Sequence, residues 1–208
     1  HTPINVALGM PNVKINPSPD TLKFLETRRS VTARMMDNIP PSDEEVERIL
    51  RIGTRVPDHG KQCPWRLVVL AGRQRLKFGE EVLAPRFGAL HPESAETTIA
   101  LEAKRFERAG VVIAVISKPT HHPKIPVWEM ELSTGAVCAH LLIAAQAMGY
   151  AAQWLTEWPA SDDVVLAALG GEPGKDRIAG FIYIGYATEA PPDRDRPALE
   201  EVTSYFGS

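Results

Sequence analysis

The chain has 208 residues and a net charge of −3 at pH 7, with 44% hydrophobic and 24% charged residues. These numbers are typical of one soluble globular domain. A weakly acidic chain gives no electrostatic reason to bind nucleic acid or an anionic membrane surface, so we expect neither partner. The longest apolar run, 139–145, is far too short to span a bilayer. The two cysteines match no metal-ligand spacing and are too few for a disulfide framework, which favours a reducing, cytoplasmic setting.

The N-terminal residues 1–19 are rich in asparagine and proline. We therefore expect an arm outside the core, followed by one domain over residues 20–208. Asp20–Arg29 is predicted to be a helix that Asp20 caps, with its two leucines and Phe24 turned inward.

Capping and turn residues predict most of the remaining helices and strands. The motif S-D-E-E at 42–45 is a capping box that begins a helix, and this helix should end before Pro57 because the residue preceding a proline avoids helical angles. A fully apolar stretch at 111–117 indicates a central strand. Apolar periodicity further predicts strands at Arg66–Leu70, Val111–Ser117, Ala151–Leu155 and Ala179–Tyr186, helices at Arg73–Val82, Glu96–Arg108 and Asp162–Leu169 (the last capped by Ser161), and a β-prone tail at Val202–Phe206.

The segment Ser133–Met148 is almost entirely apolar and is followed by Gly149, which ends a helix. A helix that is apolar all round is buried on every side. In a domain of this size only one side can pack on the chain's own core. We therefore expect a partner subunit to cover the other side and predict a homodimer.

Three features of the sequence argue against a nucleotide, phosphate-loop or metal site. The chain has no G-x-G-x-x-G, so a Rossmann nucleotide site is unsupported. The glycine-rich stretch Gly170–Asp176 lacks the P-loop spacing and follows a helix, so we interpret it as a turn. The pair His121-His122 has no further ligand at metal-binding spacing, which favours a solvated loop and no metal site.

Two short arginine clusters have the chemistry of an anion site. In Arg28-Arg29-Ser30, adjacent guanidinium groups and a hydroxyl suit bidentate contact with a phosphate. The alternative is a solvated helix end, where cations are favoured anyway. In Arg194-Asp195-Arg196, the two arginines point the same way along an extended segment and suit one anion. The alternative there is a solubilising tail.

The longer stretch Arg55–Arg66 joins the capped helix to an apolar strand. Its donors Arg55, His59, Lys61 and Gln62 crowd a turn rich in proline and glycine, which suits a polar planar ligand. A rigid connector with Trp65 in the core explains the same residues equally well.

In this order the clusters resemble the nitroreductase family, and within it the small bacterial YdjA-like nitroreductases. No single motif is decisive, but the ordered set covers the chain from about Asp20 to Phe206. The matching stretches are Arg28–Ser30, Pro40–Glu45, Arg55–Arg66, Trp128–Glu129, Ser133–Gly149, Tyr150 leading to Trp154, Phe181–Gly185 and the Arg194/Arg196 tail.

The resemblance implies an α+β fold whose central mixed or antiparallel sheet is flanked by helices, in an intertwined homodimer with FMN at its interface. It implies NADH or NADPH as the electron donor and a small-molecule acceptor, either a nitroaromatic compound or a quinone, in a ping-pong cycle. The redox chemistry then belongs to the flavin, so no catalytic side chain is required.

The resemblance also assigns the arginine clusters. By position, Arg28, Arg29 and Ser30 would contact the flavin phosphate, ribityl chain and pyrimidine edge. Arg194 and Arg196 would hold the phosphate from the C-terminal side.

The remaining implied contacts concern the flavin ring. Trp154, Leu155 and Thr156 would present backbone and hydroxyl groups near the isoalloxazine N5 and its edge. Arg55 and His59 would come from the other subunit.

Two departures from the family leave alternatives open. The family usually has glutamine directly before Pro-Trp, whereas this chain has Cys63 there and Gln62 one place earlier. Leu155 also stands where related proteins carry arginine. A flavin-binding carrier or sensor without turnover is one alternative function. A specialised flavin enzyme such as a dehalogenase is another, although the only candidate lid is the modest 82–96 stretch.

Overall fold

The computed structural model of the chain describes residues 15–207. The arm expected at 1–19 lies mostly outside the described residues. The helices and strands are α1 (Pro19–Thr27), α2 (Asp43–Gly53), β1 (Trp65–Ala71), α3 (Arg73–Phe78), α4 (Ala84–Leu90), α5 (Glu96–Ala103), β2 (Val111–Ser117), α6 (Val127–Ala147), β3 (Ala151–Leu155), α7 (Asp163–Ala168), β4 (Arg177–Gly185) and α8 (Leu199–Val202). Shorter helical turns are η1 (Ala33–Met35), η2 (His59–Lys61), η3 (Gly79–Leu83), η4 (Arg105–Arg108) and η5 (Trp158–Ser161).

The four strands form one antiparallel sheet in the order β1-β2-β4-β3. The expected α+β fold is confirmed, and of the two sheet types left open the antiparallel one is present. The two central strands are the most apolar, since every residue of β2 is buried and β4 is exposed only at its first residue, Arg177. This matches the expectation from the fully apolar 111–117 stretch. The edge strand β3 is shorter and carries half-exposed residues at its carboxyl end.

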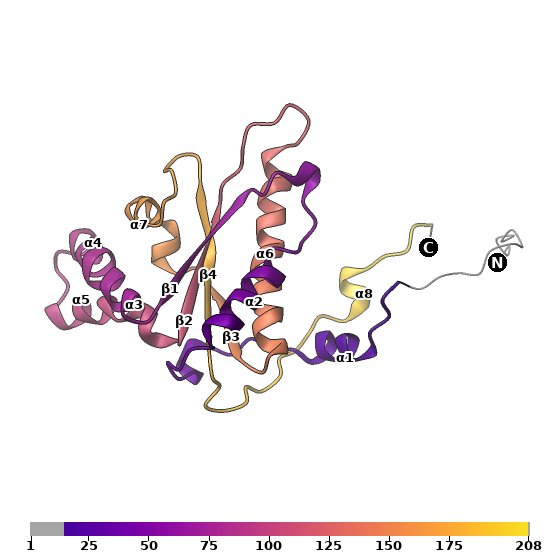
Figure 1. Cartoon of the computed structure of the whole chain (residues 1–208), viewed down its shortest axis with the longest axis horizontal. Coiled ribbons are helices and arrows are strands. Elements are labelled where there is room, and N and C mark those ends of the chain that lie inside the picture. The colour runs from indigo at the N-terminus through magenta and orange to yellow at the C-terminus, as the bar shows by residue number, and fades with distance from the viewer. Residues whose placement is uncertain (1–14, 208) are drawn as a thin grey trace, which may run out of the picture.

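Side chains of the central strands alternate between two hydrophobic cores, one on each face of the sheet. Val111, Ile113 and Val115 pack with α2 and α6. Val112, Ala114 and Ile116 belong to the other core, with Phe106 and residues of η3 and α7. Figure 1 shows α2 and α6 on one side of the sheet and α3, α4, α5 and α7 on the other.

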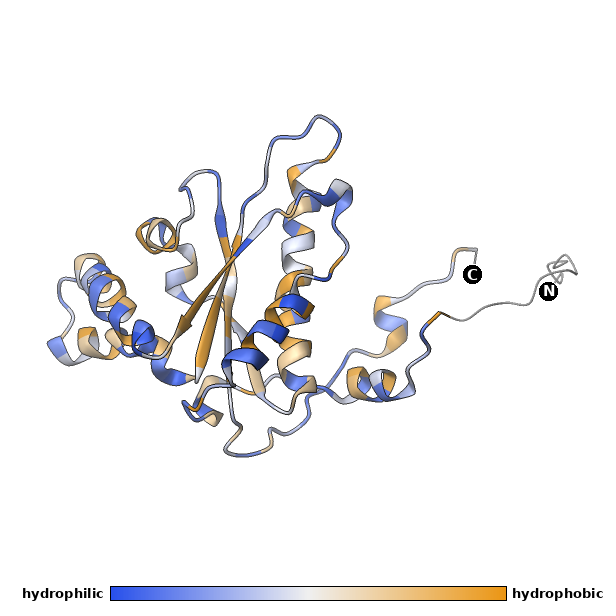
Figure 2. Ribbon diagram, viewed as in Figure 1, coloured by the Kyte–Doolittle hydropathy of each residue, from blue (hydrophilic) through white to orange (hydrophobic). Residues whose placement is uncertain are grey.

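The predicted apolar helix Ser133–Met148 forms most of α6, which begins earlier, at Val127, and carries Glu129 and Glu131 in its first turns. Its inner face, including Val137 and Leu141, is fully buried against the sheet and α2. Its outer face stays open within one chain, with Trp128 66% and Leu132 55% exposed. Along α6 this outer stripe continues through the half-exposed residues Ala136, Ala139 and Ile143. Figure 2 shows orange and pale segments alternating along α6 as a whole.

Both ends of the described chain project from this body toward the same side (Figure 1). In α1 the predicted inward turn of the leucines is wrong for a single chain, because Leu22 is 62% and Leu25 46% exposed. Its cap is Ser18, which accepts from the amide of Thr21, and not Asp20, because Pro19 occupies the first helical position. The expected β-prone tail Val202–Phe206 forms no strand, and the short helix α8 ends at the first residue of this tail.

The connection between β1 and β2 is a helical excursion through α3, η3, α4, α5 and η4. The predicted helix Glu96–Arg108 is interrupted at Lys104, where α5 ends and η4 begins. The first and last parts of this excursion contact each other at Gly79, which packs directly against the backbone of Ala103. This contact fixes the position of η4 and therefore of the side chains that η4 carries.

Two glycines of this excursion should respond in opposite ways to alanine. A Cβ at Gly79 would lie 1.7 Å from the carbonyl oxygen of Ala103, so Gly79→Ala should lower the free energy of unfolding by about 1–3 kcal/mol. A Cβ at Gly88 meets only the flexible tip of Ile99 at 3.4 Å, so Gly88→Ala should raise it by about 0.5–1 kcal/mol. Denaturant unfolding of both variants checks this, and changes of the same sign would contradict it.

Candidate functional site

The first arginine cluster lies at the carboxyl end of α6. Gln146, near the carboxyl end of α6, accepts a hydrogen bond from Arg28 Nε at 3.1 Å through its side-chain oxygen. Its amide nitrogen donates to the carbonyl of Arg29. Gln146 therefore uses both ends of its side chain to hold the two arginines where α1 has ended.

The C-terminal segment brings Arg196 near the same place, whereas the only contact shown for Arg194 among the described residues is the hydrogen bond from its amide to Asp193. Arg29 Nε donates to the carbonyl of Pro192 at 3.1 Å and lies 3.7 Å from the carboxylate of Asp193. Arg28 donates weakly to the Ser30 hydroxyl, at 3.4 Å. Burial, followed by the charges of Arg196 and Arg29, lowers the pKa of Arg28 from its ordinary value. Positive charges that crowd Arg28 in this way favour a bound anion at this place.

The edge strand β3 fixes this cluster relative to the sheet. The amide of Val31 donates to the carbonyl of Ala152 at 3.1 Å, and the amide of Ala33 donates to the side chain of Gln153 at 2.7 Å. The segment after Ser30 thus runs along β3. Trp154 and Leu155 complete β3 at its carboxyl end, and Thr156 follows directly after the strand.

Trp154 is 39% exposed, and its indole nitrogen donates to the carbonyl of Ala179 at 3.1 Å. The contact needs glycine at the next position of β4, because a Cβ on Gly180 would lie 2.1 Å from the indole nitrogen. The indole therefore covers the part of the β4 edge that extends beyond β3.

The structure does not bring Arg55 and His59 to this cluster. His59 Nδ1 pairs with Glu129 at 2.7 Å, and the Ser133 hydroxyl donates to the carbonyl of Pro57 at 2.6 Å, so this turn lies on the amino end of α6. At about 1.5 Å per residue, Glu129 and Gln146 are about 25 Å apart along the helix. In one chain the two sets of predicted residues therefore occupy opposite ends of α6.

The turn that carries the departure from the family is tightly self-bonded. The Asp58 carboxylate accepts from the amides of Gln62, at 3.2 Å, and Cys63, at 2.8 Å. The side-chain nitrogen of Gln62, Nε2, donates to the backbone carbonyl of Gly60 at 2.9 Å. Lys61 and Cys63 have positive φ angles of 53° and 47°, which L residues adopt only when their surroundings hold them there. The displaced glutamine is thus occupied within its own turn.

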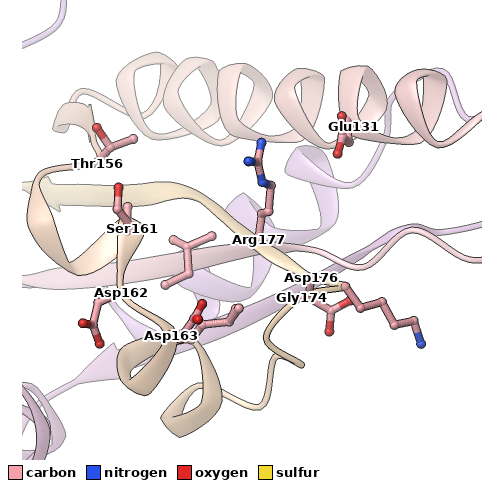
Figure 3. A pocket seen from close by; sticks show the side chains of 12 residues that line it. Glu131, Thr156, Ser161, Asp162, Asp163, Gly174, Asp176 and Arg177 are labelled. Carbon is pink, nitrogen blue, oxygen red and sulfur yellow. The ribbon is translucent and has the colours of Figure 1, made fainter.

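A pocket of about 800 Å³ opens beyond the end of β3, between α7, the start of β4 and the first turns of α6 (Figure 3). Thr156 lies at one end of it, and Arg177 extends from β4 toward α6. Asp162 accepts from the amides of Val164 and Val165 at 2.9 and 3.0 Å and pairs with Arg86 at 2.8 Å. Asp162 therefore caps α7, and the prediction of Ser161 as that cap is wrong.

The loop before β4 borders this pocket and is anchored by a buried carboxylate. Asp176, whose side chain is 1% exposed, accepts from Lys118 Nζ at 2.6 Å and from the amide of Glu172 at 2.8 Å. Burial acts to raise the pKa of Asp176, but the hydrogen bonds from Lys118 and the Glu172 amide outweigh it and lower the pKa. The Asp176 carboxylate thus lies inside the loop. The segment Gly170–Asp176 is a turn that folds around this side chain.

Within the described residues, no group of three or more histidine, cysteine or acidic side chains could hold a metal ion. In the loop that carries the histidine pair, His122 Nδ1 accepts from the amide of Lys124 at 3.1 Å. No helix in residues 15–207 combines the length and apolarity needed to cross a membrane.

Sequence reasoning missed several residues of this region. Gln146 was detectable, because it is one of the few polar residues, with His140, in the long apolar run 135–148. The others carry no local signal, since their importance arises from contacts between distant segments. They are Arg105, Arg108, Asp176, Arg177 and Glu157.

Comparison with known proteins identifies the family. The profile of the Nitroreductase family matches residues 25–186. A protein of Escherichia coli named as the NAD(P)H nitroreductase YdjA is 32% identical over 166 residues, which cover 80% of this chain and 87% of that protein. The chain belongs to the nitroreductase family.

Solved structures support the same fold. A nitroreductase-like family protein from Bacillus cereus has a TM-score of 0.75 at 20% identity, covering 94% of this chain and all of that one. A nitroreductase with bound FMN from Bacteroides fragilis has a TM-score of 0.64 at 20% identity, covering 90% of this chain and 99% of that one.

The buried carboxylate makes stability depend on acid in a defined way. Asp176→Asn should lower the free energy of unfolding at pH 7 by about 1.5–3 kcal/mol, because hydrogen bonds to the charged group are lost. The pKa of Asp176 is lowered in the folded state, so this contribution is complete above its unfolded pKa and is lost as pH falls through the folded value. The two proteins should therefore converge in acid.

Denaturant unfolding across pH measures the difference. Asp195→Asn makes the same change on an exposed residue and should have no effect at any pH. A difference between the Asp176 variant and wild type that stays constant into acid would refute the role of the ionised group.

Proposed function

We propose that the chain is an FMN-dependent NAD(P)H oxidoreductase that passes electrons to a small-molecule acceptor, a nitroaromatic compound or a quinone. The observation that carries the proposal is the cluster of Arg28, Arg29 and Arg196, whose charges crowd one another at the β3 edge. The names of the relatives, NAD(P)H nitroreductase and nitroreductase with bound FMN, support the same assignment.

The residues present fit FMN. Its phosphate is a dianion, and charge-assisted hydrogen bonds from paired arginines offset both the charge of the phosphate and the mutual repulsion of the guanidinium groups. In this proposal Arg28, Arg29 and Ser30 bind from the N-terminal side and Arg194 and Arg196 from the tail. Asp193 already orients this tail against Arg29.

The strand beyond the phosphate site would receive the flavin ring. FMN, when bound, accepts a hydride from the nicotinamide and later gives up the electrons. Backbone groups of Trp154, Leu155 and Thr156 at the end of β3 would orient the ring and donate to it where negative charge gathers on reduction. Leu155 brings no charge, so any cation near the ring must come from another segment.

The remaining residues require a second copy of the chain. His59 pairs with Glu129, about 25 Å along α6 from the arginine cluster at Gln146, and Arg55 begins the same stretch of chain, so we do not expect either to share the ligand of that cluster within one chain. We infer that they complete the site of the partner in a homodimer. The open apolar stripe of α6 and the projecting α1 and α8 are surfaces that such a partner would cover.

The location is inferred from the cysteines. Cys63 is exposed and Cys138 buried, and both are free thiols. Burial raises the pKa of Cys138 to about 12, so it stays protonated. Free thiols suit a cytoplasmic enzyme.

The purified protein mixed with FMN tests the proposal directly. We expect a retained flavin absorbance band that NADH or NADPH bleaches and that a nitroaromatic or quinone restores. Bound flavin without turnover would favour a carrier or sensor, and the absence of bound flavin would refute the proposal altogether.

Removing one arginine should weaken the cofactor site. Arg28→Ala should reduce FMN affinity by about 1.5–3 kcal/mol, roughly 10- to 150-fold, the scale of hydrogen bonds to a charged group. Arg73→Ala removes the same charge at the start of α3, beyond β1 at the opposite edge of the sheet, and should leave the affinity unchanged. Fluorescence titration of the apoprotein with FMN measures both, and equal effects would refute a specific role for Arg28.

Charge on the α6 stripe should break the dimer. Ala139→Arg places a guanidinium in the middle of the half-exposed stripe, where it can reach water in a monomer but not in a closed apolar interface. Sedimentation should show a dimer for wild type and a monomer for the variant, which should also lose FMN. Ala100→Arg on the exposed side of α5 is the matched control and should remain dimeric. A monomeric wild-type protein would contradict the proposal.

A further inference from the structure

Directly after the proposed flavin-contacting residues, Glu157 adopts a backbone conformation that is unusual for any residue other than glycine. Its φ and ψ angles are 54° and −169°. Residues other than glycine are essentially excluded from this region, so the backbone of Glu157 is strained. The conformation persists only if the surroundings hold it there.

Two arginines of η4 hold the Glu157 side chain. Arg105 Nη1 donates to one carboxylate oxygen at 2.8 Å, and Arg108 Nη2 donates to the other at 2.6 Å. Burial acts to raise the pKa of Glu157, but the bond from Arg108 and the charges of both arginines lower it overall. Glu157 therefore remains ionised, and its carboxylate is fixed at both oxygens.

The two arginines are themselves fixed. Arg105 makes a two-bond contact with Glu102, at 2.6 and 2.7 Å, and the indole of Trp158 donates to the same carboxylate at 3.0 Å. Arg108 donates to the hydroxyl of Tyr183, a residue of β4 that is 1% exposed. The two arginines thus connect the Glu157 carboxylate to α5 and to the central strand β4.

This cluster is not an anion site. Its two carboxylates, Glu102 and Glu157, balance the two guanidinium groups, and every charged group has a partner of opposite sign. The cluster has another consequence, because the φ angle of Glu157 is the first torsion after the Thr156–Glu157 peptide. The orientation of that peptide is set by whichever conformation Glu157 adopts.

We infer that Glu157 is a positioning residue: its anchored, strained backbone fixes the peptide of Thr156 at the end of β3, and with it the backbone groups that orient the flavin. The inference rests on the proposed function. In this role the Glu157 carboxylate acts through the backbone torsion that it imposes. Its negative charge does not act on the flavin ring directly.

Three substitutions at Glu157 distinguish these possibilities. Glu157→Ala removes the anchor and leaves a residue that avoids the strained region, so the peptide should reorient. Glu157→Gly removes the same anchor but adopts the region freely. Glu157→Gln is uncharged yet keeps an acceptor for one arginine. We expect the alanine variant to reduce flavin by NAD(P)H about 10- to 100-fold more slowly than wild type, as misplaced reacting groups do, with the glycine and glutamine variants in between.

The measurements are the single-turnover rate of flavin reduction, the flavin midpoint potential and the melting temperature of each FMN-loaded protein. Arg86→Met is the matched control, since it breaks another ion pair between the helical excursion and the same chain segment, at Asp162. It should lower the melting temperature without changing the rate or the potential.

Each outcome decides the inference. Equal rates for the alanine, glycine and glutamine variants would assign the effect to charge and overturn it. Lower melting temperatures with wild-type rates and potentials would make the cluster only structural and overturn it. If the alanine variant does not fold, glycine against wild type still reports the loss of the anchor. A wild-type protein that binds no FMN would refute the proposed function itself, whereas active wild type with unaffected Glu157 variants would refute this inference alone.

Discussion

The constraint on which the site depends is the crowding of like charges at the carboxyl end of α6. Arg28 and Arg29 are held side by side by the two ends of Gln146, and the tail brings Arg196 close enough to lower the pKa of Arg28. Folding therefore stores repulsion that an anion relieves. The hydrogen bond from the amide of Val31 to the carbonyl of Ala152 then aligns this charge with β3, which Thr156 follows. In the proposed function, one strand edge would set the positions of both the phosphate and the flavin ring.

The two ends of α6 hold different parts of the proposed site. The helix runs without interruption from Glu129, which pairs with His59, to Gln146, which binds Arg28 and Arg29. One rigid element therefore separates the donors His59 and Arg55 from the anion cluster. The same sequence leaves an apolar stripe along the helix. A second copy of the chain that covers the stripe and supplies the missing donors, as we propose, would account for both the open surface and the divided site.

Periodicity and capping predicted much of this fold. The strands at 111–117 and 151–155 have the expected bounds, and the capping box of Ser42 and Glu45 is formed. These features depend on neighbours in sequence. The inward turn of α1 was wrong because its leucines have no core to enter within one chain. The helical cap at Asp162 was missed because Ser161 and Asp162 are both good caps, and the pairing of Asp162 with Arg86 favours the second.

The anchored strain at Glu157 lies beyond sequence reasoning for a different reason. A glutamate carries no preference for a glycine-like backbone, so nothing in the local sequence marks it. The conformation is imposed by η4, whose position depends on the contact between Gly79 and the backbone of Ala103, two residues before Arg105. The lack of a side chain at Gly79 thus lets η3 approach the end of α5 closely. This approach places the two arginines of η4 where they contact Glu157. Support for the end of β3 therefore comes from the opposite side of the sheet, through a chain of contacts that exists only once the whole domain has folded.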